Sequence, residues 1–519
     1  MTTRRRTLCG GPPGAGGYRA LLPGPGESHE HRRDLAEPPA RAGQALLTVA
    51  HLSDLHLCDA QSPARVELLD RWADPDSPIR DELGEVGTYR AQELLTAQVA
   101  DAMVRAVNAV GRGPVAGAPL DLTVVTGDNT DNAQANELTW YLAALEGGSV
   151  RPDSGDPTRW EGVADGDVDD ERFWHPETEG SDLPRRRFGF PRVPGLLAAA
   201  RAGFDTAGLQ TPWLAVHGNH DRMLQGTVPA TGDLSMASTG RLKPIALPEH
   251  WSTDAVRELI LGLGACDPAA LAALRCLRAR RVTADAERRV FSRAEFVAAH
   301  FGPASRPHGH GFTGANRQSG LAYYRHGHGR VTVLVLDTVN EHGGWQGSVD
   351  PDQLDWLEEQ LTSADAERGY VVLASHHPLR TLINDTGAPR VLAPEVASVL
   401  DAHPCVVLWL NGHTHHTSVT PHRTWWEVTA PSLLDWPQQG RIVELIRAPG
   451  TLTVATTMLD HAGPAPWDSS VGDPGALASL ARELAANDWQ GRGLPLEQHP
   501  RAGGRDERNV LLHLRDPWN

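Results

Sequence analysis

The chain has 519 residues, of which 40% are hydrophobic, and its formal net charge is −17. A chain of this length buries a large core, and so acidic a composition argues against binding to nucleic acids or anionic membranes. The sequence contains no run of about 18 apolar residues, so it predicts no membrane span. Its five cysteines form no C-x-x-C pair, which argues against a disulfide framework and favours a reducing compartment.

The N-terminal segment, residues 1–44, is rich in glycine, proline and arginine, which predicts a flexible arm. Arg4, Arg5 and Arg6 resemble the start of an export signal. Such a signal also needs an apolar stretch of roughly 7–15 residues, and glycine and proline stand in its place. We therefore expect a cytoplasmic protein rather than an exported one.

Five short apolar runs follow along the chain, and each ends in polar turn residues. They cover residues 45–50, 120–126, 212–216, 370–374 and 405–410. Short apolar runs of this kind are typical of fully buried strands. Apolar residues recur at helical spacing in residues 91–110 and 351–361, and Asp350 can cap the second of these helices. Strands that alternate with helices predict an α/β protein.

Three more strand-like runs follow at short spacing, in residues 425–429, 441–446 and 451–459. Pro449-Gly450 predicts a hairpin turn between the last two. We expect a second, more antiparallel sheet here, packed on the first. The predicted fold is thus an α/β sandwich of two packed mixed β-sheets flanked by helices, with its site at the C-terminal ends of strands.

One domain is expected over residues 45–465, with a C-terminal tail of helical and extended segments, residues 466–519, packed on it. Two polar, glycine-rich insertions interrupt the domain at about 146–195 and 223–320, and the second contains a helical piece at 254–281. Loops this long in an α/β enzyme usually form lids or substrate walls. We expect the fold to survive trimming of both insertions.

The turns after the five strands carry five polar motifs. These are Asp54-Leu55-His56, Gly127-Asp128, Gly218-Asn219-His220-Asp221, His376-His377-Pro378 and Gly412-His413-Thr414-His415. Carboxylates, an amide oxygen and imidazoles suit divalent ions such as Mn, Fe or Zn. Two such ions about 3.5–4 Å apart can clamp the attacking and leaving oxygens of a phosphoryl displacement. The set therefore indicates a site for two divalent ions.

The five motifs, in this order, resemble those of the calcineurin-like metallophosphoesterase superfamily, whose pattern is D-x-H, G-D, G-N-H-[DE], a later His and G-H-x-H. The resemblance covers residues 54–415, apart from the insertions. It implies that one ion is held by Asp54, His56 and His415, that Asp128 bridges both ions, and that the other ion is held by Asn219, His376 and His413. It also implies that His220 is the catalytic histidine.

Four further assignments leave alternatives open. His376 and His377 compete for one ligand position, and alternation along an extended segment would let only one of them bind. Asp131 either orients His220, as acids at this offset do in the protein-phosphatase branch, or caps the helix that begins near Ala133. Asn129 either touches a substrate phosphate or shapes its turn.

Arg222 either binds a substrate phosphate or pairs with surface acids.

The resemblance implies a phosphoesterase that hydrolyses a phosphomonoester or phosphodiester by attack of a metal-bridging hydroxide. Its expected partner is a small phosphorylated substrate, with no nucleic acid and no membrane. The alternative is a non-catalytic scaffold with the same fold, although such scaffolds typically lose ligands and this chain keeps them all.

Overall fold

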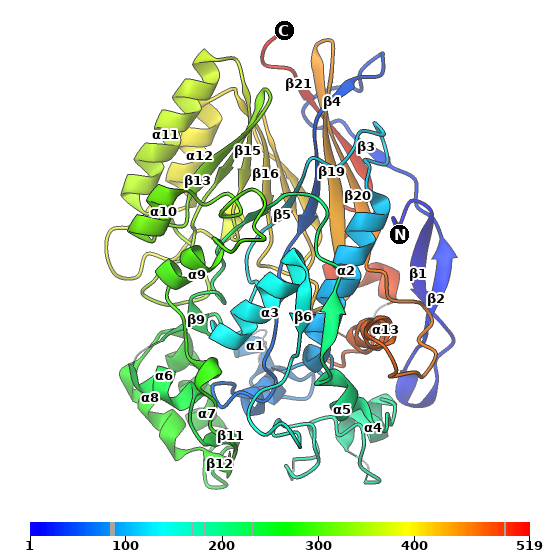
Figure 1. The fold of residues 1–519 in the computed structure, drawn as a ribbon, viewed down its shortest axis with the longest axis vertical. Helices are drawn as coiled ribbons and strands as arrows, with labels where there is room; N and C mark the ends of the chain where they lie inside the picture. Colours follow the sequence, from blue (N-terminus) through cyan, green and yellow to red (C-terminus); the bar gives the residue numbers. More distant parts are fainter. Residues whose placement is uncertain (84–88, 169, 181, 231, 492–494) are drawn as a thin grey trace.

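Two mixed β-sheets pack against each other at the centre of the molecule (Figure 1). The structure is a computed structural model that describes residues 1–519 except 84–88, 169, 181, 231 and 492–494. Within the described residues the first sheet has seven strands, in the order β3 (Glu30–Arg32), β21 (Val510–Arg515), β20 (Thr451–Asp460), β19 (Gln439–Ala448), β4 (Gln44–Leu52), β5 (Leu122–Val125) and β8 (Trp213–Ala215). The second sheet has six strands in the same described part of the chain, in the order β13 (Tyr324–His328), β14 (Val331–Val335), β15 (Tyr370–Ala374), β16 (Val406–Asn411), β18 (Trp426–Thr429) and β17 (Ser418–Pro421). The predicted fold class is confirmed.

The strands that precede the five motifs run parallel within each sheet. β4, β5 and β8 are neighbours in the first sheet, and β15 and β16 are neighbours in the second. Their predicted boundaries agree with the structure to within about two residues. Because parallel neighbours end at the same edge of a sheet, the motif turns of each sheet lie together.

Helices cover the outer faces of the two sheets. α11 (Pro351–Ala366) and α12 (Ala393–Ala402) pack on the second sheet, while α2 (Thr96–Val110) packs with α13 (Pro474–Ala486) and against β20 of the first (Figure 1). Side chains of β15 alternate accordingly. Val372 lies in the core between the sheets, whereas Val371 and Leu373 pack with α11 and α12.

The strands after the last motif do not form a sheet of their own, so that part of the prediction is wrong. β19 and β20 make the predicted hairpin, but β19 also pairs antiparallel with β4, and β18 pairs parallel with β16. The physical reason is that β4 and β16 each have a second edge whose backbone groups need partners. The hairpin therefore extends the first sheet.

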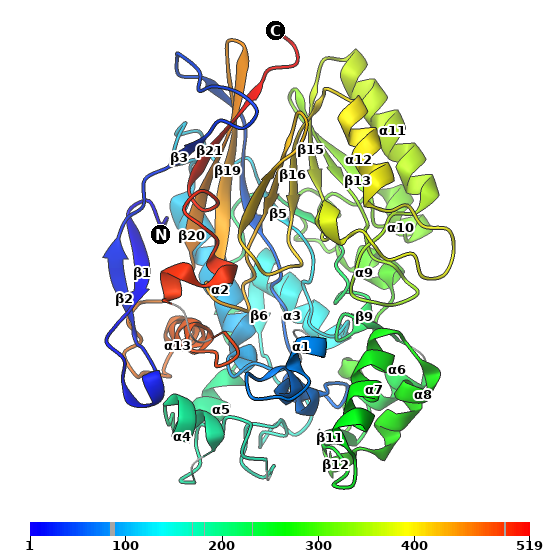
Figure 2. The ribbon, with the colours of Figure 1, turned by 180° about the vertical axis from the view of Figure 1, so that it is seen from behind.

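Both ends of the chain are built into the first sheet, whereas we expected a flexible arm at the N-terminus. β3 forms an edge of the sheet by pairing with β21, and Arg508 forms an ion pair with Glu27. The hairpin of β1 (Arg6–Gly10) and β2 (Leu21–Pro25) lies beside α13 (Figure 2), where Leu21 N–H donates to the Glu483 carboxylate at 3.2 Å. Backbone pairing at an open sheet edge holds the segment despite its glycine and proline content.

The larger insertion is only partly external. Its elements are β9 (Met223–Leu224), β10 (Val228–Pro229), α6 (Gly232–Ser238), β11 (Leu242–Ala246), α7 (Thr253–Gly264), α8 (Pro268–Ala273), β12 (Arg278–Arg281), α9 (Arg293–Ala299) and α10 (Gly314–Ser319). The single helical piece predicted at 254–281 is thus two helices and a strand, because Asp267 and Pro268 begin a new helix. Phe296 and Phe312 are 0% and 2% exposed and belong to the main core. Trimming all of this insertion would open that core, contrary to our expectation.

The smaller insertion and its surroundings contain short elements. These are β6 (Gly148–Val150), α4 (Leu183–Phe188), α5 (Leu196–Ala200) and β7 (Phe204–Thr206), while α1 (Arg80–Leu83) and α3 (Ala135–Glu146) lie nearer the motifs in sequence. No single described helix has the length and apolarity to cross a membrane. Only α7 taken together with residues 268–276, a pair bent by 120° among the described residues, reaches that length and apolarity.

Candidate metal centre

Backbone hydrogen bonds bring the motif turns of both sheets together. Asp54 N–H donates to the Gly127 carbonyl at 3.0 Å, which joins the turns after β4 and β5. Gly412 N–H donates to the His376 carbonyl at 2.9 Å, which joins the turns after β15 and β16. His413 N–H then reaches the Asp54 carboxylate at 3.1 and 3.2 Å. This last contact links the two sheets directly at the site.

Five of the seven predicted ligands have a left-handed backbone conformation that non-glycine residues rarely adopt. Their φ angles are 53° for Asp54, 46° for His56, 49° for Asp128, 68° for His413 and 56° for His415. Strain of this kind persists where the surrounding structure enforces it, and it clusters at functional sites. Three of the five motifs, those of Asp54, Asp128 and His413, therefore share a strained backbone geometry.

Asp54, His56 and His415 form one group of converging ligand atoms. His415 Nε2 lies 3.4 Å from Asp54 Oδ1 and 3.2 Å from His56 Nε2. Each imidazole is held from behind by a buried carboxylate: His56 Nδ1 contacts Asp131 Oδ1 at 3.2 Å, and His415 Nδ1 contacts Asp435 Oδ2 at 2.6 Å. With Nδ1–H donating to a carboxylate, Nε2 is the ring atom left to bind an ion.

The Asp128 carboxylate lies between this group and the next. Its Oδ2 is 3.8 Å from His56 Nε2 and 3.1 Å from His376 Nε2, and its Oδ1 accepts the His220 N–H at 2.8 Å. The side chain is almost fully buried, at 2% exposure. This is the position that a bridging carboxylate would need.

His376 and His377 differ in what their ring nitrogens contact. His376 Nδ1 donates to the Thr126 carbonyl at 2.8 Å, which leaves Nε2 directed at Asp128. His377 has partners at both nitrogens, the Thr338 hydroxyl at 2.8 Å and the Trp345 carbonyl at 3.1 Å. The structure thus leaves a ligand atom free on His376 and commits both nitrogens of His377 to the protein.

Asn219 and His413 complete the second group. The Asn219 side-chain amide donates to the Gly226 carbonyl at 2.9 Å, so its Oδ1 is turned the other way. The His413 ring lies 5.1 Å from that of His376, centre to centre. A Cβ on Gly226 would come within 2.3 Å of His220 Nε2, so only glycine fits beside the two motif side chains.

The residues present fit a metal centre. Asn219 Oδ1 is buried and forms no hydrogen bond with any described residue, and the contact of the buried His376 Nε2 is the proposed ligand Asp128, at 3.1 Å. Buried polar atoms normally have partners, and His376 Nε2 belongs to groups of converging carboxylate and imidazole ligands. Oxygen and imidazole ligands without thiolate are the ligand set of Mn, Fe or Zn.

The carboxylates give the site a negative potential that favours cations. Burial by itself would lower the pKa of His376, but Asp128 and Asp54 raise that pKa to about 9. Burial likewise opposes protonation of His415, whose pKa is raised to about 9 by Asp435 and Asp54. The potential that stabilises these imidazolium ions would equally stabilise divalent cations in their place.

His220 lies beside the first group, with its ring 4.5 Å from that of His56. Its Nδ1–H donates to the backbone carbonyl of Asp131 at 2.6 Å, while the Asp131 carboxylate is 3.9 Å from that nitrogen and bonds to His56 and Arg65 instead. The orienting contact therefore comes from the Asp131 main chain. Asp131 does not cap α3, because Gln134 does.

Asn129 and Arg222 lie in the turns next to the ligands. The Asn129 amide is fully buried and donates to the Val216 carbonyl at 3.0 Å and to Asp221 Oδ2 at 2.8 Å, so it shapes its turn. Arg222 is partly exposed, and its guanidinium forms no hydrogen bond or ion pair with any described residue. Of these two residues, Arg222 is therefore the one whose side chain is available to a ligand.

Two supporting carboxylates escaped the sequence analysis. Asp221 closes the second and third motif turns by accepting hydrogen bonds from Gly218, Asn129 and Thr130, and its place in the third motif could have indicated this role. Asp435 lies in the loop before β19, where no spacing or neighbouring motif marks it.

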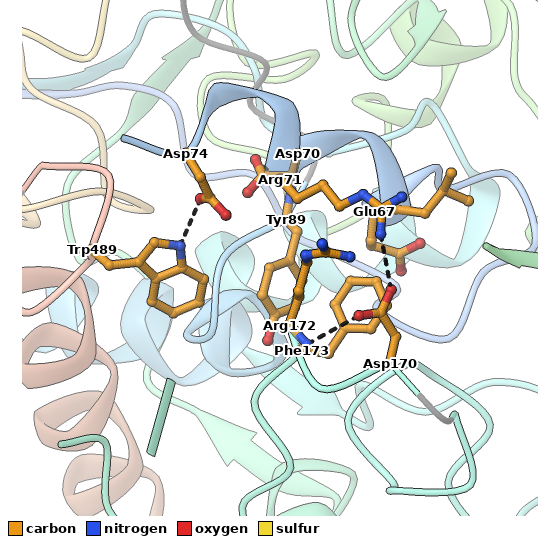
Figure 3. A pocket seen from close by; sticks show the side chains of 10 residues that line it. Glu67, Asp70, Arg71, Asp74, Tyr89, Asp170, Arg172, Phe173 and Trp489 are labelled. Atoms are coloured by element: carbon orange, nitrogen blue, oxygen red, sulfur yellow. Dashed lines mark hydrogen bonds and ion pairs between the residues drawn. The ribbon is translucent and has the colours of Figure 1, made fainter. Parts of the chain in front are cut away.

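A separate hollow lies away from the motif residues (Figure 3). It is lined by Asp70, Asp74, Tyr89, Phe173 and Trp489 among others, and Trp489 Nε1 donates to Asp74 at 2.8 Å. None of the predicted site residues lines it. The motif residues, rather than this hollow, carry the ligand chemistry.

No family model matches the chain. Over 74 residues it is 45% identical to the manganese-dependent ADP-ribose/CDP-alcohol diphosphatase of Xenopus tropicalis, and over 71 residues it is 34% identical to the human protein of that name. Each match covers 14% of this chain, and the chain spans about a fifth of the length of these curated relatives, 21%.

Among solved structures, a dimetal phosphatase from Danio rerio aligns over 80% of this chain and 100% of its own, with 12% identity and a TM-score of 0.37. A purple acid phosphatase from yellow lupin aligns over 88% and 56%, with 10% identity and a TM-score of 0.30. The short sequence matches are to proteins named as manganese-dependent diphosphatases, which agrees with the metal-ligand chemistry of the motifs. The resemblance to the calcineurin-like metallophosphoesterase superfamily is therefore confirmed.

Proposed function

We propose that this protein is a metal-dependent phosphoesterase with two divalent ions. The observation that carries the proposal is the convergence of six carboxylate and imidazole ligands from four turns, Asp54, His56, Asp128, His376, His413 and His415, with the buried Asn219 Oδ1 forming no hydrogen bond to any described residue. The manganese dependence in the names of the relatives supports Mn as one candidate ion. Two bound ions would supply an activated water and would neutralise charge on the phosphoryl oxygens.

The chain's own residues have separable roles in this proposal. Asp54, His56 and His415 would hold one ion, Asn219, His376 and His413 the other, and Asp128 both. His220 keeps Nδ1–H on the Asp131 carbonyl, so Nε2 is the atom that can hold or pass a proton at the leaving oxygen. The Asp128 carboxylate fixes the backbone of His220 through the 2.8 Å hydrogen bond.

Two side chains near the ligands suit a nucleotide-like substrate. Arg222 is a cation whose guanidinium forms no ion pair with any described residue, so it can bind a phosphate. Trp345 is 49% exposed, and its ring stacks on that of His413 at 5.8 Å and 24°. Exposed tryptophan next to a ligand offers a stacking surface for a base. Since the relatives are named as diphosphatases of ADP-ribose and CDP-alcohols, we propose diphosphate esters of nucleosides as first candidate substrates.

A substrate panel tests the proposal. Metal-free protein is reloaded separately with Mn, Fe and Zn, the bound ions are counted by elemental analysis, and turnover is measured with ADP-ribose, a CDP-alcohol, a nitrophenyl phosphomonoester and a bis-nitrophenyl diester. We expect two ions per chain and metal-dependent hydrolysis. Two bound ions without hydrolysis of any ester would favour the scaffold alternative. Hydrolysis of the nitrophenyl esters alone would overturn the nucleoside assignment.

A further inference from the structure

A closed ring of buried polar contacts surrounds the two imidazoles assigned to the first ion. On one side His56 contacts Asp131, whose other oxygen accepts a hydrogen bond from Arg65. On the other side His415 contacts Asp435. The Asp435 carboxylate accepts hydrogen bonds from Nε and Nη2 of Arg90, the latter at 3.1 Å, and also forms an ion pair with Arg501 at 2.5 Å.

Glu93 joins the two sides. Its Oε2 accepts Arg65 Nη2 at 2.7 Å and the Arg90 main-chain N–H at 2.9 Å. Because His56 Nε2 and His415 Nε2 lie 3.2 Å apart, the chain of contacts closes on itself. Asp131, Arg65, Glu93 and Asp435 are 6%, 2%, 4% and 1% exposed, so the ring lies almost entirely away from water.

Because these contacts are buried, the loss of one charged partner is far more costly than it would be at the surface. A buried charge that loses its partner is strongly destabilised, so Asp131 is held in place by Arg65, and Asp435 by Arg90 together with Arg501. The orientation of a metal-binding imidazole depends on the acceptor behind its second nitrogen. Among the described residues the second group is supported differently, since His376 Nδ1 donates to the neutral Thr126 carbonyl.

We propose that Arg65 and Arg90 are positioning residues for the first ion. They act through Asp131 and Asp435 on His56 and His415, and Glu93 couples the two arms so that the imidazoles keep one relative orientation. The inference rests on the proposed metal centre and does not depend on which ester is hydrolysed.

Arg65→Met and Arg90→Met in the full chain test it, with Mn²⁺ titrated into the metal-free proteins by calorimetry. Wild-type protein should show two Mn²⁺ binding steps. The step that is lost in His56→Ala belongs to the first ion, the one held by Asp54, His56 and His415. Each methionine variant should weaken that step by about 10–100-fold and leave the other step unchanged. Because Glu93 joins the arms, the double variant should lose less than the product of the two single effects.

Arg288→Met is the matched control. Arg288 is fully buried and pairs with Asp59 at 3.2 Å, but it is not part of the ring. Its loss should lower stability without changing either Mn²⁺ affinity. Arg65→Lys, which keeps the charge, should recover part of the lost affinity. Where a methionine variant does not fold, Asp435→Asn keeps the size of the side chain and should weaken the first ion in the same way.

The proposal is overturned if folded Arg65→Met and Arg90→Met bind both ions as wild type does, or if Arg288→Met weakens the first ion equally. If the wild-type chain binds no ion at all, the proposed metal centre itself fails, which is a different outcome. Histidine nitrogen chemical shifts give a second readout: the Nδ1–H form of His56 and His415 should be lost in the variants and kept in Arg288→Met.

Discussion

The two halves of the candidate metal centre are held by different groups. In the half formed by Asp54, His56 and His415, each imidazole rests on a buried carboxylate, Asp131 or Asp435. In the half formed by Asn219, His376 and His413, the His376 ring rests on a backbone carbonyl, and the Asn219 amide donates to another.

This difference has a physical consequence for metal binding. A carboxylate behind an imidazole fixes its tautomer and makes the free nitrogen a stronger donor, whereas a neutral carbonyl mainly orients the ring. We therefore expect the first ion to be held more tightly than the second. The four predictions below would break or sharpen this contrast.

Asp128→Asn should have the largest effect, because it weakens the one ligand common to both halves. We expect both ions to be lost at micromolar metal concentration. The rate of hydrolysis should fall by more than the roughly 10–100-fold expected when a residue that only supports a metal ligand is removed. Asp385→Asn, a change at an exposed carboxylate, is the control and should change neither. Elemental analysis that finds two ions in Asp128→Asn would contradict the bridging assignment.

His220→Ala should separate catalysis from metal binding in both halves. If Nε2 passes a proton to the leaving oxygen, kcat should fall by roughly 10²–10⁴-fold while two ions remain bound. The loss should be smaller for nitrophenyl esters, whose leaving groups need little protonation. An equal loss for good and poor leaving groups would exclude the proton-transfer role.

His56→Ala and Asn219→Ala test the halves one at a time. Each removes a ligand of one ion, so each protein should keep one ion of two. The ion that remains in Asn219→Ala should bind more tightly than the one that remains in His56→Ala, since the carboxylate-backed half is then intact. Mn²⁺ titrations followed by electron paramagnetic resonance measure both, and the reverse order of affinities would refute the contrast.

Phe296→Ala tests whether packing in the core stabilises the ligands of the second ion, Asn219, His376 and His413. Phe296 is fully buried in the larger insertion, and its ring lies 5.1 Å from that of His217, next to the third motif. The free energy of unfolding should fall by about 3–5 kcal/mol, with a weaker second ion and a nearly unchanged first. Met236→Ala, at a residue 67% exposed in the same insertion, should change stability by less than about 0.5 kcal/mol. Urea unfolding compares the two.

The order of the motifs and the strands before them could be predicted from sequence because both signals are local. An apolar run followed by a polar turn is visible in a few residues, and the ligand types are visible in the letters of each motif. Arg65, Arg90 and Asp435 carry no such signal. They act at the site only because residues 65, 90 and 435 meet in space, which no local pattern encodes.

The sequence by itself thus determined the two-sheet class, the five turns and the chemistry of their side chains. Only the tertiary structure decided that β19 pairs with β4, that the N-terminal segment lies along the sheet edge, and that His377 is committed to Thr338 and Trp345 while His376 keeps a free nitrogen. The reason is the same in each case. Strand edges and ring nitrogens take whatever partner lies within hydrogen-bonding distance in the folded chain, and sequence separation does not set that distance.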